Sequence, residues 1–205
     1  MVLRAHGEPA GATRVGELRR TRRVAEATKP FAHGLASMVI GPSMTAVHMT
    51  WGAINEWTTQ AGYARLAQRC DHPVLAEMLR RIMRQEGRHI DFYAAQATKR
   101  LAESRRSQWL TRRALTRFWA PVGSDLMPEQ EVRHLISFLF GGDDGSAMAA
   151  RIDRRIDNLP GLRGLGLVSK ARASTTGELG DHWRERLDIV RADDHVADSP
   201  ALATA

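Results

Sequence analysis

The sequence has few of the residues that mark disulfide-bonded, membrane-spanning or β-rich proteins. Cys70 is the single cysteine in 205 residues, which excludes an internal disulfide and fits a reducing, cytoplasmic location. Apolar runs stay well below the roughly 18–20 residues of a membrane span, and the N-terminal residues lack the apolar core of a signal peptide. Aromatic residues make up 6% of the chain and β-branched runs are scarce, so an all-α protein is predicted.

Acidic residues are outnumbered by basic ones, 23 against 30, which gives a formal net charge of +7. Such a surface favours anionic partners, among them nucleic acid, phospholipid and an acidic carrier protein, and charge alone selects none of them. A basic helical protein that binds nucleic acid is the less favoured alternative, because the sequence shows no helix-turn-helix pattern and no basic strip interleaved with aromatic residues.

The length suits one domain, which we expect to be a helical domain over residues 13–170. Residues 1–12 are predicted to be a flexible lead-in and residues 171–205 a poorly ordered acidic tail. Residues 13–29 predict a basic helix that ends before Pro30, and residues 31–40 a short helix. The first long helix is predicted from Ser43, as N-cap, to about Cys70, and the second from Pro73, after a cap at Asp71 or His72, to about Ser104. Further helices are predicted over residues 105–120, from Pro128 to Gly141, and over residues 144–158.

Two of these later helices have apolar residues that we expect to face inward. Over residues 105–120 these are Trp109, Leu110, Ala114, Leu115, Phe118 and Trp119, and in the next helix they are Val132, Leu135, Ile136 and Leu139. His134 then falls on the outer side and is predicted to lie at the surface.

The two long helices between residues 43 and 104 each have a carboxylate in the middle of a predicted buried face. The first row is His48, Gly52, Glu56, Thr59, Tyr63 and Leu66, and the second is Leu75, Leu79, Ile82, Glu86, His89, Tyr93 and Ala97. Antiparallel packing across the break at residues 71–73 would bring Glu56 close to Glu86 and His89. Because carboxylates and imidazoles are costly to bury without partners, their convergence in a helical core suggests a metal site.

Glu86 and His89 form a Glu-x-x-His pair, which places both side chains on one helix face where they can bind one ion. With Glu56 they make half of a di-iron carboxylate site, since the complete set takes a Glu from each of two helices and Glu-x-x-His from each of two others. Carboxylate and imidazole ligands suit iron or manganese. The alternative is a Glu–His pair satisfied within a bundle, or one left at the surface. We interpret His48 as a core or outer-sphere histidine, and Tyr63 and Tyr93 as packing residues.

These motifs resemble those of a known family. The residues that match are Trp51, Glu56, Thr59, Tyr63 and Leu66, followed by Glu86, His89, Phe92 and Tyr93. This pattern is similar to the second half of ferritin-like proteins, above all the soluble acyl-carrier-protein desaturases (fatty acid desaturase type 2), over residues 30–165. The resemblance implies a ferritin-like bundle in which Glu56, Glu86 and His89 bind iron and activate dioxygen against an acyl chain. It also implies that an acidic acyl carrier protein docks on the basic segment from Arg105 to Arg117.

The first half of such a site has no clear counterpart in this sequence. The family would place an earlier Glu-x-x-His about fifty residues before Glu56, where this chain has His6 but Leu3 in place of the glutamate. Three hypotheses follow. The chain forms a homodimer with a site shared across a two-fold axis, or it is a degenerate relative with a weak or lost metal site, or the functional protein is longer.

Overall fold

The computed structural model describes residues 41–124 and 127–175, and within these ranges it is all-helical, as predicted. The helices are α3 (Pro42–Arg69), α4 (Pro73–Glu103), α5 (Arg105–Phe118), α6 (Glu129–Phe140), α7 (Gly142–Asp157) and α8 (Leu167–Ala173). None of the helices in these ranges is long and apolar enough to cross a membrane. The predictions for the lead-in, for His6, for the helices over residues 13–29 and 31–40, and for the tail beyond Thr175 lie outside the described residues.

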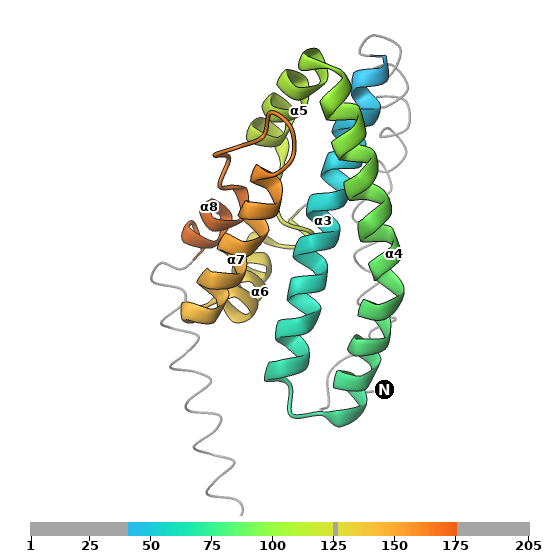
Figure 1. Cartoon of the computed structure of the whole chain (residues 1–205). Helices are drawn as coiled ribbons and strands as arrows, with labels where there is room; N and C mark the ends of the chain where they lie inside the picture. The colour runs from blue at the N-terminus through green and yellow to red at the C-terminus, as the bar shows by residue number, and fades with distance from the viewer. Residues whose placement is uncertain (1–40, 125–126, 176–205) are drawn as a thin grey trace, which may run out of the picture.

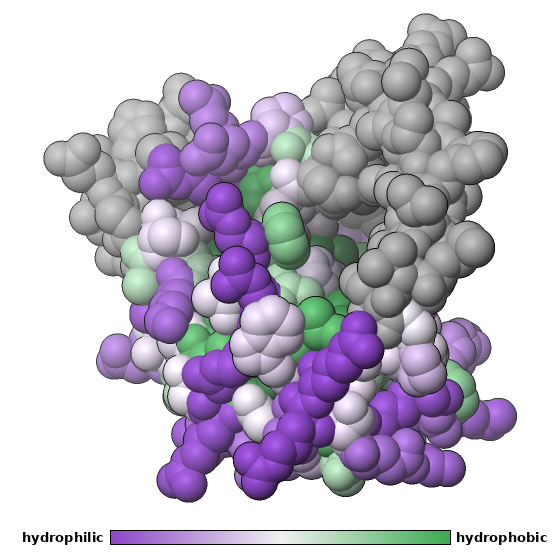
Figure 2. All heavy atoms as spheres, turned by 90° about the horizontal axis from the view of Figure 1, so that it is seen from above, coloured by the Kyte–Doolittle hydropathy of each residue, from purple (hydrophilic) through white to green (hydrophobic). Residues whose placement is uncertain are grey.

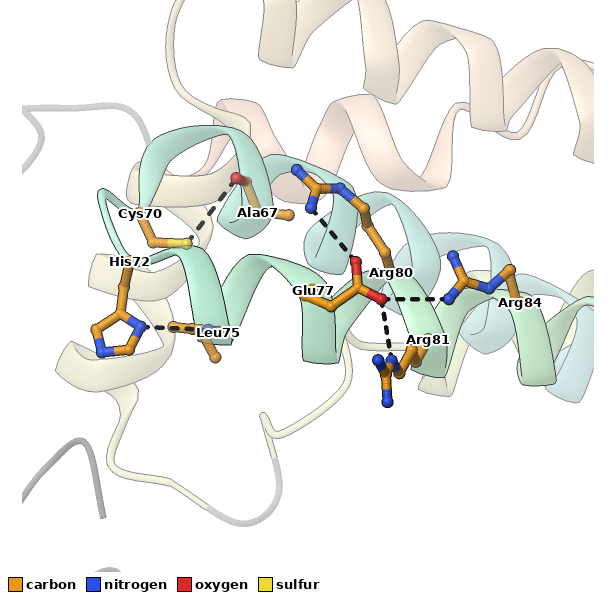
Figure 3. A network of polar contacts seen from close by, with 8 residues as sticks. All are labelled: Ala67, Cys70, His72, Leu75, Glu77, Arg80, Arg81 and Arg84. Carbon is orange, nitrogen blue, oxygen red and sulfur yellow. Dashed lines mark hydrogen bonds and ion pairs between the residues drawn. The ribbon is translucent and has the colours of Figure 1, made fainter.

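Helices α3 and α4 form an antiparallel hairpin joined at residues 70–72 (Figure 1). The cap predicted at this turn is confirmed: the His72 side chain, at Nδ1, accepts a hydrogen bond of 3.2 Å from the backbone N–H of Leu75, and Pro73 follows it (Figure 3). The cap predicted for α3 is wrong, because the helix begins at Pro42 after Gly41. Ser43 is instead buried, and its Oγ accepts a hydrogen bond of 3.0 Å from Ser107 Oγ on α5.

The first turns of α4 present a solvated cluster of charges rather than a packed surface (Figure 3). Glu77 accepts a hydrogen bond of 2.9 Å from Arg81 Nε, and Arg80 and Arg84 lie within 3.7 Å and 3.6 Å of its carboxylate oxygens. The hydrogen bond from Arg81 is the main cause that lowers the pKa of Glu77. Exposed pairs of this kind contribute little to stability, so the packing of α4 has to come from its other side.

Helix α3 lies between α4 on one side and α5 to α8 on the other (Figure 1). Most of the buried core comes from α3 and from the segment that runs from α7 through α8. Its α3 members are Ala46, Ala53, Ile54 and Trp57, and its later members are Ala149, Ile152, Ile156, Leu159, Leu162, Leu165, Leu167 and Val168. Among the described helices, α4 is therefore at the edge, where it packs against α3 and, near its end, against α5.

Helix α5 does not bury the residues that its apolar pattern predicted. Trp109 and Phe118 are 61% and 71% exposed, whereas the buried residues are Ser107, Thr111 and Leu115. This stripe of small and medium side chains allows close packing against α3. The prediction that both aromatic residues face inward is therefore wrong, because the side of α5 that its neighbours cover is narrower than the side that carries apolar residues.

Two further expectations are corrected by the packing around α6 and α7. Leu135 is 38% exposed rather than inward, and His134 is half-buried, with its ring stacked on Phe138 at 6.3 Å between centroids rather than at the surface. Helix α8 was not predicted. Its N-terminus is capped from another helix: the buried carboxylate of Asp153 on α7 accepts hydrogen bonds of 3.0 Å from the backbone N–H groups of Val168 and Ser169.

Candidate metal centre

The register between α3 and α4 is set by contacts one turn on either side of the candidate site. On one side, Gln60 Nε2 donates a hydrogen bond of 3.2 Å to the backbone carbonyl of Met83. On the other side, Gly52 lies against the ring of Tyr93. Because the helices are antiparallel, these contacts place Glu56 level with the α4 turn that contains Glu86 and His89.

The structure brings the predicted residues together. Glu56, Glu86 and His89 each offer one ligand atom, and these atoms all lie within 4.8 Å of one another. His89 Nδ1 and Glu86 Oε2 lie 2.7 Å apart. With its proton on Nδ1, His89 donates this hydrogen bond and keeps the Nε2 lone pair for another partner. The convergence predicted from spacing alone is thus present, and metal binding by these residues remains a prediction.

The predicted position of the site in a buried core is wrong. The side chain of His89 is 64% exposed and that of Glu86 is 33% exposed, and Glu56 is half-buried. The row of α4 residues that was predicted to be buried, spaced three and four apart, includes His89. The residues of α4 that are buried are Ala76, Leu79, Ile90, Ala97 and Leu101. The covered face is therefore centred closer to Ile90, which leaves His89 at the rim of the α3–α4 seam.

The electrostatics of the site favour the addition of positive charge. Partial burial is the main cause that raises the pKa of Glu56, the negative charge of Glu86 raises it further, and His89 acts in the opposite direction. Two carboxylates held this close repel each other when both are ionised. Either a proton or a metal cation would relieve that repulsion, so the two compete for the same place.

The neighbours of the site pack around it rather than complete it. His48, expected to be in the core or an outer sphere, is exposed, and its ring lies edge-on to Tyr93 with 6.5 Å between centroids. Tyr93 is half-buried and packs as predicted. Sequence reasoning missed Asn55, whose Oδ1 accepts a hydrogen bond of 3.3 Å from Trp119 Nε1 and so ties α3, beside Glu56, to the end of α5. In the sequence, the only indication of this role is that Asn55 directly precedes Glu56.

A scan of protein-family models and searches of curated proteins and of solved structures find no match. Two carboxylates and one imidazole are hard and borderline ligands that suit iron or manganese. Three protein ligands at a partly exposed position would leave coordination positions open to water or a substrate, which is typical of catalytic rather than structural sites.

Proposed function

We propose that Glu56, Glu86 and His89 bind a divalent metal ion, iron in preference and manganese as the alternative, in a ferritin-like helical protein related to the soluble acyl-carrier-protein desaturases. The observation that carries the proposal is the approach of three ligand atoms, from two helices, to within 4.8 Å of one another. The raised pKa of Glu56 supports it, because carboxyl groups whose pKa is shifted by burial and by a neighbouring charge are common at functional sites.

We further propose that two copies of the chain share a di-iron centre and act as an oxidoreductase. One chain offers two carboxylates and one histidine, which is half of the set that carboxylate-bridged iron pairs use. The exposed side of His89 leaves room for the matching residues of a second copy. Iron in such a centre supplies the chemistry of dioxygen activation. An acidic acyl carrier protein at the basic segment from Arg105 to Arg117 is a separate expectation from the resemblance, and metal binding does not depend on it.

The main alternative is a non-catalytic helical scaffold. The direct hydrogen bond between Glu86 and His89 favours it, because the two side chains satisfy each other without an ion. The exposure of His89 favours it too, since an exposed imidazole needs no ligand to offset the loss of water.

Metal content and molecular mass of the purified chain, expressed with iron, separate these functions. The test variant is Glu86→Gln, and the matched control is Glu77→Gln, which removes a carboxylate from the same helix away from the site. About one iron per chain in a dimer, lost in the test variant and kept in the control, is expected for a shared di-iron centre. One ion per chain in a monomer would support metal binding and exclude sharing. Absence of metal in the unaltered protein would contradict both metal proposals and support the non-catalytic scaffold.

A further inference from the structure

The solvent face of α5 combines one exposed aromatic ring with all of the arginines of that helix. Figure 2 looks onto the end of the molecule where α5 lies, and strongly hydrophilic residues gather there around less polar ones. The helical repeat places Trp109 opposite the buried stripe of Ser107, Thr111 and Leu115. Its neighbours on that face are Arg105, Arg106, Arg112, Arg113 and Arg117, and α5 contains no acidic residue.

This face is hollowed into a pocket of about 310 Å³. The described residues that line it are Trp109, Arg112, Arg113, Thr116 and Arg117. Its volume is at the lower end of the range that small-molecule sites occupy, so it suits one small ligand or one unit of a polymer. The metal centre on α3 and α4 contributes none of these lining residues, and the two sites can be tested independently.

Two of the three arginines of the pocket are held in place, and none of the three is paired with a carboxylate of the described residues. Arg112 Nη1 donates hydrogen bonds of 3.3 Å and 2.9 Å to the backbone carbonyls of Gly161 and Arg163, which holds the guanidinium while its other N–H groups stay available. The guanidinium carbon of Arg113 lies over the Trp109 ring, 6.0 Å from its centroid. Within the described ranges, no carboxylate forms an ion pair with an arginine of α5.

We propose that this pocket binds a nucleotide unit, with its phosphate on the guanidinium groups and its base against Trp109. Guanidinium groups match the planar, bidentate geometry of phosphate oxygens. An exposed indole ring offers a stacking surface that every base can use, and stacking beside cations is how nucleotides are held without readout of their sequence. A ligand that consists of an anion alone would not account for the exposed Trp109 ring beside the arginines. A free nucleotide and a nucleotide within a single strand present the same chemistry to the pocket.

Calorimetric titration of the full-length protein with ADP, inorganic phosphate and a short oligothymidylate tests this proposal and separates the sources. The variants are Arg113→Gln with Arg117→Gln, and Trp109→Leu; all three side chains are exposed, so the fold should be kept. The matched control is Arg105→Gln with Arg106→Gln, which removes the same two charges from the same helix outside the residues that line the pocket. Thermal unfolding of each variant checks that it is folded.

The double arginine variant is expected to weaken ADP binding about tenfold or more, as the loss of hydrogen bonds to a charged group predicts. Trp109→Leu should weaken ADP binding about fivefold or more and leave phosphate binding unchanged, and the control should change either by less than about twofold. Tighter binding of the oligonucleotide than of ADP would assign the pocket to a strand, and the reverse to a free nucleotide. Equal losses in the control and the double variant, or no effect of Trp109→Leu, would overturn the proposal. So would binding of polyglutamate without any nucleotide binding, which would identify a dock for an acidic protein.

Discussion

Gly52 of α3 is covered by the ring of Tyr93 of α4, so closely that a Cβ atom at Gly52 would lie 2.5 Å from Tyr93 Cδ1. The contact is one turn from Glu56 on α3 and one turn from His89 on α4. A missing side chain at this position therefore lets the two helices approach where the candidate ligands face each other. The spacing between α3 and α4 at the metal centre depends on this pair.

Gly52→Ala should separate the helices and lower the free energy of unfolding by about 1–3 kcal/mol, the usual cost of overpacking. Metal affinity should fall with it, because the ligand atoms move apart. Chemical denaturation and metal titration measure the two effects. Gly87→Ala is the control: a Cβ there meets nothing within 4 Å, so it should stabilise α4 by about 0.5–1 kcal/mol. Equal effects of the two substitutions would show that the Tyr93 contact does not set the spacing.

Glu56→Gln should raise the melting temperature of the metal-free protein at pH 7. Because burial, helped by Glu86, raises the pKa of Glu56, the folded state holds its proton more tightly than the unfolded state does. That contribution to stability is complete below the ordinary glutamate pKa and is lost as the pH rises through the raised pKa. The gain from glutamine should therefore shrink as the pH falls towards 4, where both side chains are neutral.

Melting curves across this pH range provide the measurement, with Glu77→Gln as a contrast of opposite sign. Arg81 lowers the pKa of Glu77, so the stabilising effect of Glu77 is present above its ordinary pKa and fades in acid. The Glu77 variant should then be no more stable than the parent at pH 7. A Glu56 variant that melts below the parent at pH 7 without metal would show that the carboxylate is already satisfied.

Asp153→Ala should cost about 1–3 kcal/mol of unfolding free energy, because two backbone N–H groups at the start of α8 would lose a charged acceptor. Asp153 is 8% exposed, and its carboxylate on α7 accepts hydrogen bonds from the backbone N–H groups of Val168 and Ser169. Denaturant unfolding compares it with Asp157→Ala, whose exposed carboxylate accepts one hydrogen bond of 2.8 Å from Gly164 N. The Asp157 variant should lose about 1 kcal/mol or less. Similar losses would mean that burial of Asp153 adds nothing to its role as a cap.

Local sequence signals predicted the cap of α4 but not that of α3, where Ser43 is buried against α5 instead of capping the helix. His72 and Pro73 mark the start of α4, and the observed cap, His72, is one of the two residues predicted for that role. Helix α8 escaped prediction because its cap, Asp153, comes from a different helix and its seven residues are too few to show a periodic pattern.

The grouping of Glu56, Glu86 and His89 was contained in the sequence, because spacing within a helix and a short antiparallel turn between helices are both local properties. Whether that group is buried, and which side of α5 meets water, was decided by the tertiary structure. Both depend on how much of each helix its neighbours cover: α3 covers the side of α4 near Ile90, and α5 packs through Ser107, Thr111 and Leu115. An apolar or periodic arc shows what a helix can bury, but the number and position of its neighbours determine what it does bury.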